Sequence, residues 1–196
     1  MKICVFGAAS ARIKDVYIEE VEKLGEKMAE RGHSLVYGAG STGLMGAAAR
    51  GVARKGGYVH GVVPHFFKES RLEVIYQNCD KITYTETMRE RKAIMEDDAD
   101  AFIIVPGGVG TFEEMFEIIT LKQLGRHNKA IAIFDINGYY DIMEDFIRVS
   151  TSEKFITEEC AKLFVNMTDA DAILDYLENY VPIEYNHLTF KGGEEK

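Results

Sequence analysis

The stretch of sequence that decides the fold reads AFIIVPGGVGTFEE and spans residues 101–114. An apolar run, residues 101–105, is followed by a Pro-Gly-Gly turn and then by a segment with helical spacing. A run that is apolar on both faces is typical of a strand buried inside a parallel sheet. Strand, turn and helix together predict one βα unit, with its turn at the carboxyl end of the strand.

The same alternation of short apolar runs and amphipathic stretches continues on both sides of this unit. We expect strands at residues 2–6, 34–37, 58–63, 81–84, 101–105, 130–134 and 163–165, and helices at residues 15–31, 44–55, 86–98, 112–124, 140–150, 157–162 and 170–180. Between the third strand and residue 80 the sequence carries no clear pattern. Repeated βα units predict a Rossmann-like, doubly wound parallel sheet in a single domain. We expect this domain to span residues 1–182 and to be followed by a C-terminal tail, residues 183–196.

Composition excludes several classes of protein. Of 196 residues, 23 are Lys or Arg and 32 are Asp or Glu, and the net charge of −9 argues against a nucleic-acid polymer as partner. No apolar stretch reaches the roughly 18 residues of a membrane span, and the apolar part of the N-terminus is too short for a signal peptide. Cys4, Cys79 and Cys160 form no CxxC motif, and the histidines show no metal-binding spacing. We therefore expect a protein of the reducing cytoplasm, with no disulfide and no metal site.

Three predicted strands end in glycine-containing turns, at residues 7–10, 38–43 and 106–111. In open parallel sheets, ligands bind beyond the carboxyl ends of the strands, where backbone amides and the helix dipole favour an anion. One such turn alone is as often structural as functional, whereas three in so short a chain favour at least one phosphate site. None of them is a Walker loop, because no Gly-Lys-Ser/Thr follows.

Thr111 and Glu114 admit two interpretations. Thr111 is a good N-cap residue, and Thr111-x-x-Glu114 fits a capping box, in which the glutamate has a structural role. However, Glu113 and Glu114 also place two carboxylates beside an expected anion site. That arrangement is unfavourable unless a carboxylate takes part in the chemistry or a cation compensates its charge.

Arg91 is a candidate for that cation. On the helix expected over residues 86–98, it lies three residues from Met88 and Ile94 and four from Met95, so it falls beside the apolar face. The alternative is a solvated side chain that extends past its apolar neighbours into water.

Two motifs now stand together: Met88-x-x-Arg91-Lys92-x-x-Met95 and, beginning fifteen residues after the arginine, Pro106-Gly107-Gly108-x-Gly110-Thr111-x-Glu113-Glu114. This pair resembles the LOG ("Lonely Guy") family, whose members are nucleoside 5′-monophosphate phosphoribohydrolases best known for activating cytokinins. The resemblance extends from the first strand to about residue 180, through Gly40-x-x-Gly43-Leu44-Met45-Gly46 and Asn137-Gly138-Tyr139-Tyr140 among other segments. Relatives also carry the older name lysine decarboxylase, but no lysine here has the sequence context of a pyridoxal phosphate Schiff base.

The resemblance implies a Rossmann-like homodimer that uses no cofactor. Its reaction would hydrolyse the N-glycosidic bond of a purine nucleoside 5′-monophosphate, of cytokinin type or adenosine, and release the free base and ribose 5-phosphate. The catalytic arginine and glutamate of the family fall on Arg91 and Glu114. Its substrate contacts fall on Lys92, Gly107, Gly108, Val109, Gly110, Thr111, Phe112, Glu113 and Thr120.

One segment departs from the plant members of the family. After Pro64 the chain continues with His65 and Phe66 where plant members carry an acidic residue, and the segment from there to Arg91 is longer than theirs. It belongs to the wall expected to face the base.

A non-catalytic nucleotide or molybdenum-cofactor carrier on the same fold is the alternative function. Arg91 with Glu114 favours the enzyme, because a carrier needs no carboxylate at the sugar.

Overall fold

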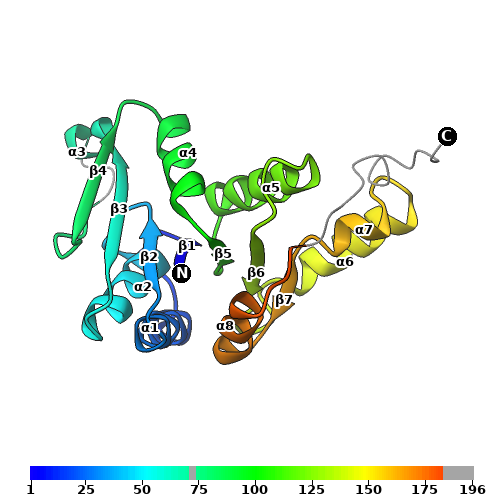
Figure 1. The fold of residues 1–196 in the computed structure, drawn as a ribbon, viewed down its shortest axis with the longest axis horizontal. Helices are drawn as coiled ribbons and strands as arrows, with labels where there is room; N and C mark the ends of the chain where they lie inside the picture. The colour runs from blue at the N-terminus through cyan, green and yellow to red at the C-terminus, as the bar shows by residue number, and fades with distance from the viewer. Residues whose placement is uncertain (71–73, 183–196) are drawn as a thin grey trace.

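The computed structural model describes residues 1–70 and 74–182, so the predicted tail, residues 183–196, lies outside the described residues. In the described part, one sheet contains β1 (Lys2–Phe6), β2 (Ser34–Tyr37), β3 (Val59–Pro64), β4 (Lys81–Thr85), β5 (Ala101–Ile104), β6 (Ala130–Phe134) and β7 (Val165–Met167). All neighbouring strands pair in parallel, in the order β4-β3-β2-β1-β5-β6-β7 (Figure 1). The predicted Rossmann-like, doubly wound sheet is confirmed.

Helices cover both faces of this sheet. They are α1 (Asp15–Glu30), α2 (Gly43–Arg54), α3 (His65–Ser70), α4 (Met88–Asp98), α5 (Val109–Gln123), α6 (Asp141–Ser152), α7 (Glu158–Ala161) and α8 (Ala170–Glu178). As Figure 1 shows, α1, α2 and α8 lie on one face of the sheet, and α4 and α5 lie on the other.

The strands explain why both faces are covered. In β5, Ala101 and Ile103 belong to the core under α1, α2 and α8, whereas Phe102 and Ile104 belong to the core under α4 and α5. Successive side chains of a strand point to opposite faces, so a continuous apolar run needs apolar partners on each side. The continuous apolar run at residues 101–105 predicted a central strand for this reason.

Local structure differs from the sequence-based expectation in two places. Residues 65–70, where no element was predicted, form α3, which is too short to show a helical period in sequence. Helix α5 begins at Val109 after Gly108 as N-cap, so Thr111 is not the N-cap and the proposed capping box does not exist. The Thr111 side chain instead packs over Gly107, where a Cβ would stand 2.1 Å from Thr111 Oγ1. The two successive glycines, Gly107 and Gly108, thus allow α5 to begin at Val109, before the start at residue 112 that Thr111 as N-cap predicted.

The strand order places the candidate site. Chain order reverses between β1 and β5, and ligands of such sheets bind in the crevice at this switch point. The turns that follow these two strands are joined there by a hydrogen bond of 3.1 Å from the Ala8 amide to the Pro106 carbonyl.

Candidate active site

The three glycine-containing turns do not have the same role. In the second turn, the Leu44 amide donates to the Ala8 carbonyl at 2.8 Å, and Thr42 Oγ1 donates to the Ala9 carbonyl at 2.7 Å. Gly43 makes this close packing possible, because its φ is +62° and a Cβ there would stand 2.3 Å from the Ala8 oxygen. The start of α2 therefore packs against the first turn, and its Leu44 amide is not available to a ligand.

The third turn is open. Gly108, Val109 and Gly110 are exposed, and no residue in the ranges 1–70 and 74–182 accepts a hydrogen bond from the amides of Val109, Gly110 and Thr111. The first amides of a helix lack partners within the helix and carry the positive end of its dipole. These donors can bind an anion at the start of α5.

Arg91 of α4 and Glu114 of α5 face one another across the crevice. Their exposed fractions are 4% and 8%, and Arg91 Nη1 lies 3.6 Å from Glu114 Oε1. Arg91 Nε also donates to the Val62 carbonyl at 3.2 Å. The alternative of a solvated arginine is therefore wrong. A buried guanidinium requires such compensation, because removing a charge from water is costly.

Two further residues shape the surroundings of the guanidinium. The ring centroid of Phe67, on α3, lies 5.9 Å from Arg91 Cζ, which is a cation–π distance. At Gly38, directly after β2, a Cβ would stand 1.6 Å from Arg91 Nη2. The absence of a side chain at this glycine is what leaves room for the arginine.

These groups line a cavity of about 410 Å³ between the turns that follow β1 and β5. Its lining residues are Gly7, Ala8, Ala9, Ser10, Met45, Phe67, Met88, Arg91, Gly108, Gly110, Thr111, Glu113 and Glu114. The cavity thus has an amide-rich end at the start of α5, a buried Arg–Glu pair in its wall, and an apolar patch made by Met45, Phe67 and Met88.

The other predicted contact residues lie around this cavity. Lys92 forms ion pairs with Glu113 and with Glu117, the latter at 2.5 Å. Burial lowers the pKa of Lys92, but its hydrogen bonds to the two carboxylates outweigh that effect and leave the pKa raised. Phe112 packs edge-on against Tyr140, and Val109 is 84% exposed at the rim. Thr120 is exposed on α5 and does not line the cavity.

Sequence reasoning missed Phe67, Met45 and Gly38 as neighbours of the predicted pair. Phe66 and Phe67 are adjacent aromatic residues in a segment without other apolar pattern, and this was the available signal for a ligand wall. Met45 and Gly38 gave no such signal, because their relation to the site depends on where α2 and β2 lie.

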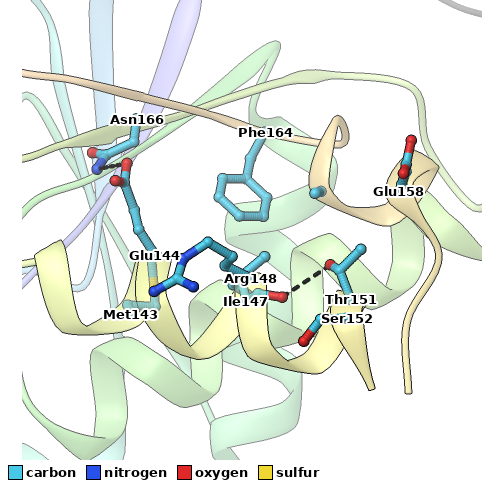
Figure 2. Close-up of a pocket in the computed structure, with 10 residues that line it drawn as sticks. Met143, Glu144, Ile147, Arg148, Thr151, Ser152, Glu158, Phe164 and Asn166 are labelled. Carbon is cyan, nitrogen blue, oxygen red and sulfur yellow. Dashed lines mark hydrogen bonds between the residues drawn. The ribbon is translucent and has the colours of Figure 1, made fainter. Parts of the chain in front are cut away.

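Two other cavities lie elsewhere in the described residues, and the smaller of them shares Ala8 and Gly108 with the cavity that holds Arg91 and Glu114. One of about 240 Å³ lies on the other side of the third turn and is lined by Ile13, Tyr17, Leu44 and Tyr139, among others. Another of about 560 Å³ lies between α6, α7 and β7, around the ring of Phe164 and a 2.6 Å hydrogen bond from Asn166 to Glu144 (Figure 2). It shares no residue with the cavity that holds Arg91 and Glu114.

Within residues 1–70 and 74–182, no three His, Cys, Asp or Glu side chains are grouped so that they could hold a metal ion. None of the helices in the same ranges has the length and apolar character to span a membrane.

Comparison with known proteins gives one family and a set of similar folds. The family model described as "Possible lysine decarboxylase" matches residues 45–177. A cytokinin riboside 5′-monophosphate phosphoribohydrolase of Arabidopsis thaliana is 38% identical over 181 residues, which are 92% of this chain and 84% of that protein. An Oryza sativa subsp. japonica protein of the same name is 39% identical over 181 residues, covering 92% of this chain and 74% of its own.

Among solved structures, the molybdenum cofactor carrier protein of Chlamydomonas reinhardtii is similar with a TM-score of 0.68 at 20% identity, over 90% of this chain and 95% of that one. The molybdenum cofactor binding protein of Rippkaea orientalis has the same TM-score at 15% identity, over 90% and 94%. At these identities the likeness concerns the fold alone.

Proposed function

Because this chain belongs to the LOG family, we propose that it hydrolyses the N-glycosidic bond of a purine nucleoside 5′-monophosphate and releases the free base and ribose 5-phosphate. Cytokinin-type and adenosine monophosphates are the proposed substrates. The observation that carries the proposal is the buried pair of Arg91 and Glu114, 3.6 Å apart, in the wall of a cavity into which the start of α5 opens.

In this proposal the two ends of the cavity hold the two ends of the substrate. The amides of Val109, Gly110 and Thr111 bind the 5′-phosphate, which the α5 dipole also favours. Met45, Phe67 and Met88 contact the flat, largely apolar faces of the base. The ribose then lies between them, beside Glu114.

Glu114 and Arg91 act on the bond that breaks. As the C1′–N bond opens, its electron pair leaves with the base and positive charge develops on the ribose. The Glu114 carboxylate stabilises that charge and orients the water whose oxygen bonds to C1′, by analogy with glycoside hydrolysis. Across the whole reaction, the water supplies the hydroxyl group on C1′ and the proton that the released base carries. Arg91, held by the Val62 carbonyl, fixes the carboxylate and offers its remaining N–H groups to substrate oxygens. Such fixed charges are commonly the largest catalytic contribution.

We propose further that the protein is a homodimer. Helix α6 has no buried residue, and one of its faces carries Ile142, Phe146 and Val149, which are 82%, 62% and 50% exposed. The opposite face lines the cavity of Figure 2. An apolar stripe on a helix favours burial against a second copy, and a two-fold interface would use the same stripe from both copies.

A reducing cytoplasm is the compartment that we propose. All three cysteines are free thiols, and two of them, Cys4 and Cys160, are buried. Burial also raises the pKa of the Cys4 and Cys79 thiols, which disfavours the reactive thiolate. These features suit a compartment that keeps thiols reduced.

The proposed activity is tested by incubating the protein with AMP and with isopentenyladenosine 5′-monophosphate. Released base and ribose 5-phosphate should appear in equal amounts with the wild type and not with Glu114→Gln. A carrier would bind the nucleotide and return it intact, so binding without release of base would support the carrier instead. Release of base by Glu114→Gln at the wild-type rate would contradict the proposed role of the carboxylate.

A further inference from the structure

The turn that precedes α5 has every carbonyl oxygen engaged. The donors come from three segments: Tyr140 Oη donates to Val105 O at 2.9 Å, the Ala8 amide to Pro106 O at 3.1 Å, Tyr139 Oη to Gly107 O at 2.5 Å, and the Phe112 amide to Gly108 O at 3.0 Å. Two of these four donors are hydroxyls of consecutive tyrosines, to which the proposed reaction assigns no role.

The direction of a carbonyl decides the direction of an amide. A peptide unit is planar and trans, so its C=O and its N–H point to opposite sides. When Tyr139 holds the Gly107 carbonyl, it also fixes the Gly108 N–H. If that peptide unit turned over, a carbonyl oxygen would face the site and repel a phosphate. The Val105 carbonyl belongs to the peptide unit of Pro106, which has no N–H, so Tyr140 anchors the beginning of the turn.

The β6–α6 turn is built to deliver both hydroxyls. Asn137 and Gly138 have φ values of +63° and +69°, and this left-handed pair reverses the chain directly before the tyrosines. The Tyr140 amide donates to Asp135 Oδ1 at 3.2 Å, and the two tyrosine rings meet edge to face with centroids 5.0 Å apart. Because β5 and β6 are neighbours in the sheet, this turn lies beside the Pro-Gly-Gly turn.

The two hydroxyls differ in their surroundings. Tyr140 is 1% exposed, and burial raises the pKa of its hydroxyl far above the usual range, so it remains a donor at any ordinary pH. Tyr139 is 41% exposed, and its ring packs edge-on against Tyr17. Removing the Tyr139 hydroxyl therefore alters one hydrogen bond at the turn and little of the core.

We propose that Tyr139 and Tyr140 are positioning residues for the phosphate site, whose hydroxyls hold the Gly107 and Val105 carbonyls away from it, so that the Gly108 N–H faces the 5′-phosphate beside the amides at the start of α5. This inference rests on the proposed function and adds to it the residues that shape the anion loop. Neither tyrosine touches the reacting atoms, so their removal affects phosphate binding before it affects bond cleavage.

The test compares Tyr139→Phe with Tyr17→Phe. The second variant removes a hydroxyl from the adjoining ring but no hydrogen bond to the Pro-Gly-Gly turn. For Tyr139→Phe, we expect KM for AMP and the dissociation constant of ribose 5-phosphate, measured by calorimetry, to rise about tenfold, the equivalent of one hydrogen bond. The kcat for AMP should stay within about threefold, and the slow cleavage of adenosine, which has no phosphate, should stay within about twofold, since the cleavage chemistry is untouched. Tyr17→Phe should match the wild type in all four measurements.

Three results would overturn the inference. Wild-type affinity of Tyr139→Phe for ribose 5-phosphate would show that the turn does not need the hydroxyl. Equal losses for AMP and adenosine would indicate a general loosening rather than a phosphate effect. Failure of the wild type to bind ribose 5-phosphate or release base would overturn the proposed function, and the positioning role with it.

Tyr140→Phe is a second variant. It should lower Tm, because it leaves a buried carbonyl without a partner, and it should also raise KM for AMP.

Discussion

Glu114 and Arg91 are far apart in sequence, and the fold brings them together as one chemical unit. Glu114 lies in the second turn of α5, where it is 8% exposed and faces the guanidinium of Arg91. A carboxylate in that position is held by a charge partner and can still reach the cavity. Its role therefore depends on charge, which an isosteric amide removes.

Replacing Glu114 by Gln should lower kcat for AMP by about 10²-fold or more, because the amide cannot stabilise a cationic ribose. Glu96→Gln is the matched control on α4. Burial and the nearby Glu117 raise the pKa of Glu96 to about 7, so its carboxyl is already partly neutral at pH 7. Steady-state kinetics should show kcat for Glu96→Gln within about threefold of the wild type. Equal losses in the two variants would speak against a specific role of Glu114.

Gly38 is a second residue whose importance lies in a contact. A methyl group there would overlap Arg91 Nη2, so Gly38→Ala should displace the guanidinium from Glu114. We expect kcat/KM to fall at least tenfold and the free energy of unfolding to fall by about 1–3 kcal/mol, as for other overpacked cores. Urea denaturation and AMP kinetics measure the two effects. An alanine variant with unchanged kcat/KM would show that the arginine can act from another position.

At the scale of the elements, α5 carries both the anion site and the carboxylate on one rigid unit. Its first amides lie at the amide-rich end of the cavity, and Glu114 follows within the next turn. In the proposed function, the same helix therefore holds both the 5′-phosphate and C1′ of the substrate.

Adenosine should consequently be a much poorer substrate than AMP, although the bond to be cleaved is identical. Charge-assisted hydrogen bonds contribute roughly 1.5–3 kcal/mol each, so the loss of two or three should lower kcat/KM by about 10³-fold or more. Ribose 5-phosphate should compete with AMP, whereas ribose should not. Comparable kcat/KM values for the two substrates would mean that the start of α5 is only structural.

The far part of α5 makes stability depend on pH through a buried lysine. Lys122 is 2% exposed, its Nζ donates to the Leu163 carbonyl at 2.9 Å, and it lies 4.7 Å from the ring centroid of Tyr180. Burial lowers the pKa of Lys122 to about 8. An unfolded lysine titrates near 10.4, so between these two values the unfolded chain binds more protons at this residue than the folded chain.

Stability should therefore rise with pH through the Lys122 contribution, from about pH 8 to about pH 10, by up to roughly 3 kcal/mol. Below pH 8 both states hold the proton, and this contribution does not change with pH. The measurement is the free energy of unfolding in urea at pH 7.5 and 9.5 for the wild type and Lys122→Met. The wild type should gain more than the variant over this interval; parallel pH profiles would contradict the assignment.

At the scale of the whole molecule, the exposed face of α6 is the contact between copies in the dimer that we propose. Light scattering at micromolar concentration should give twice the chain mass of 22.0 kDa. The double substitution Ile142→Glu and Phe146→Glu should give the single-chain mass, because it places two charges in the apolar stripe. Val16→Glu, on the opposite side of the sheet, is the control and should stay dimeric. A wild-type monomer would refute the proposed dimer.

The sequence by itself determined the class of fold and predicted Arg91 and Glu114 as the central pair of the site. Apolar runs and helical spacing are local properties, so β1, β2 and β6 begin and end where they were predicted, and Arg91 lies on the apolar side of its helix. The family resemblance then joined Arg91 to Glu114 across a distance in sequence that local pattern does not cover.

Only the tertiary structure decided which groups meet. The second glycine turn was, like the third, a candidate anion site, but the Ala8 carbonyl accepts from the Leu44 and Met45 amides near the start of α2, while the amides at the start of α5 stay open. Gly38, Phe67 and Tyr139 approach the site from three other segments because strand order brings the ends of β2, β3 and β6 toward it. Periodicity encodes the direction of a side chain relative to its own element. Contacts between elements depend on strand order and on packing at the switch point, which no single stretch of sequence contains.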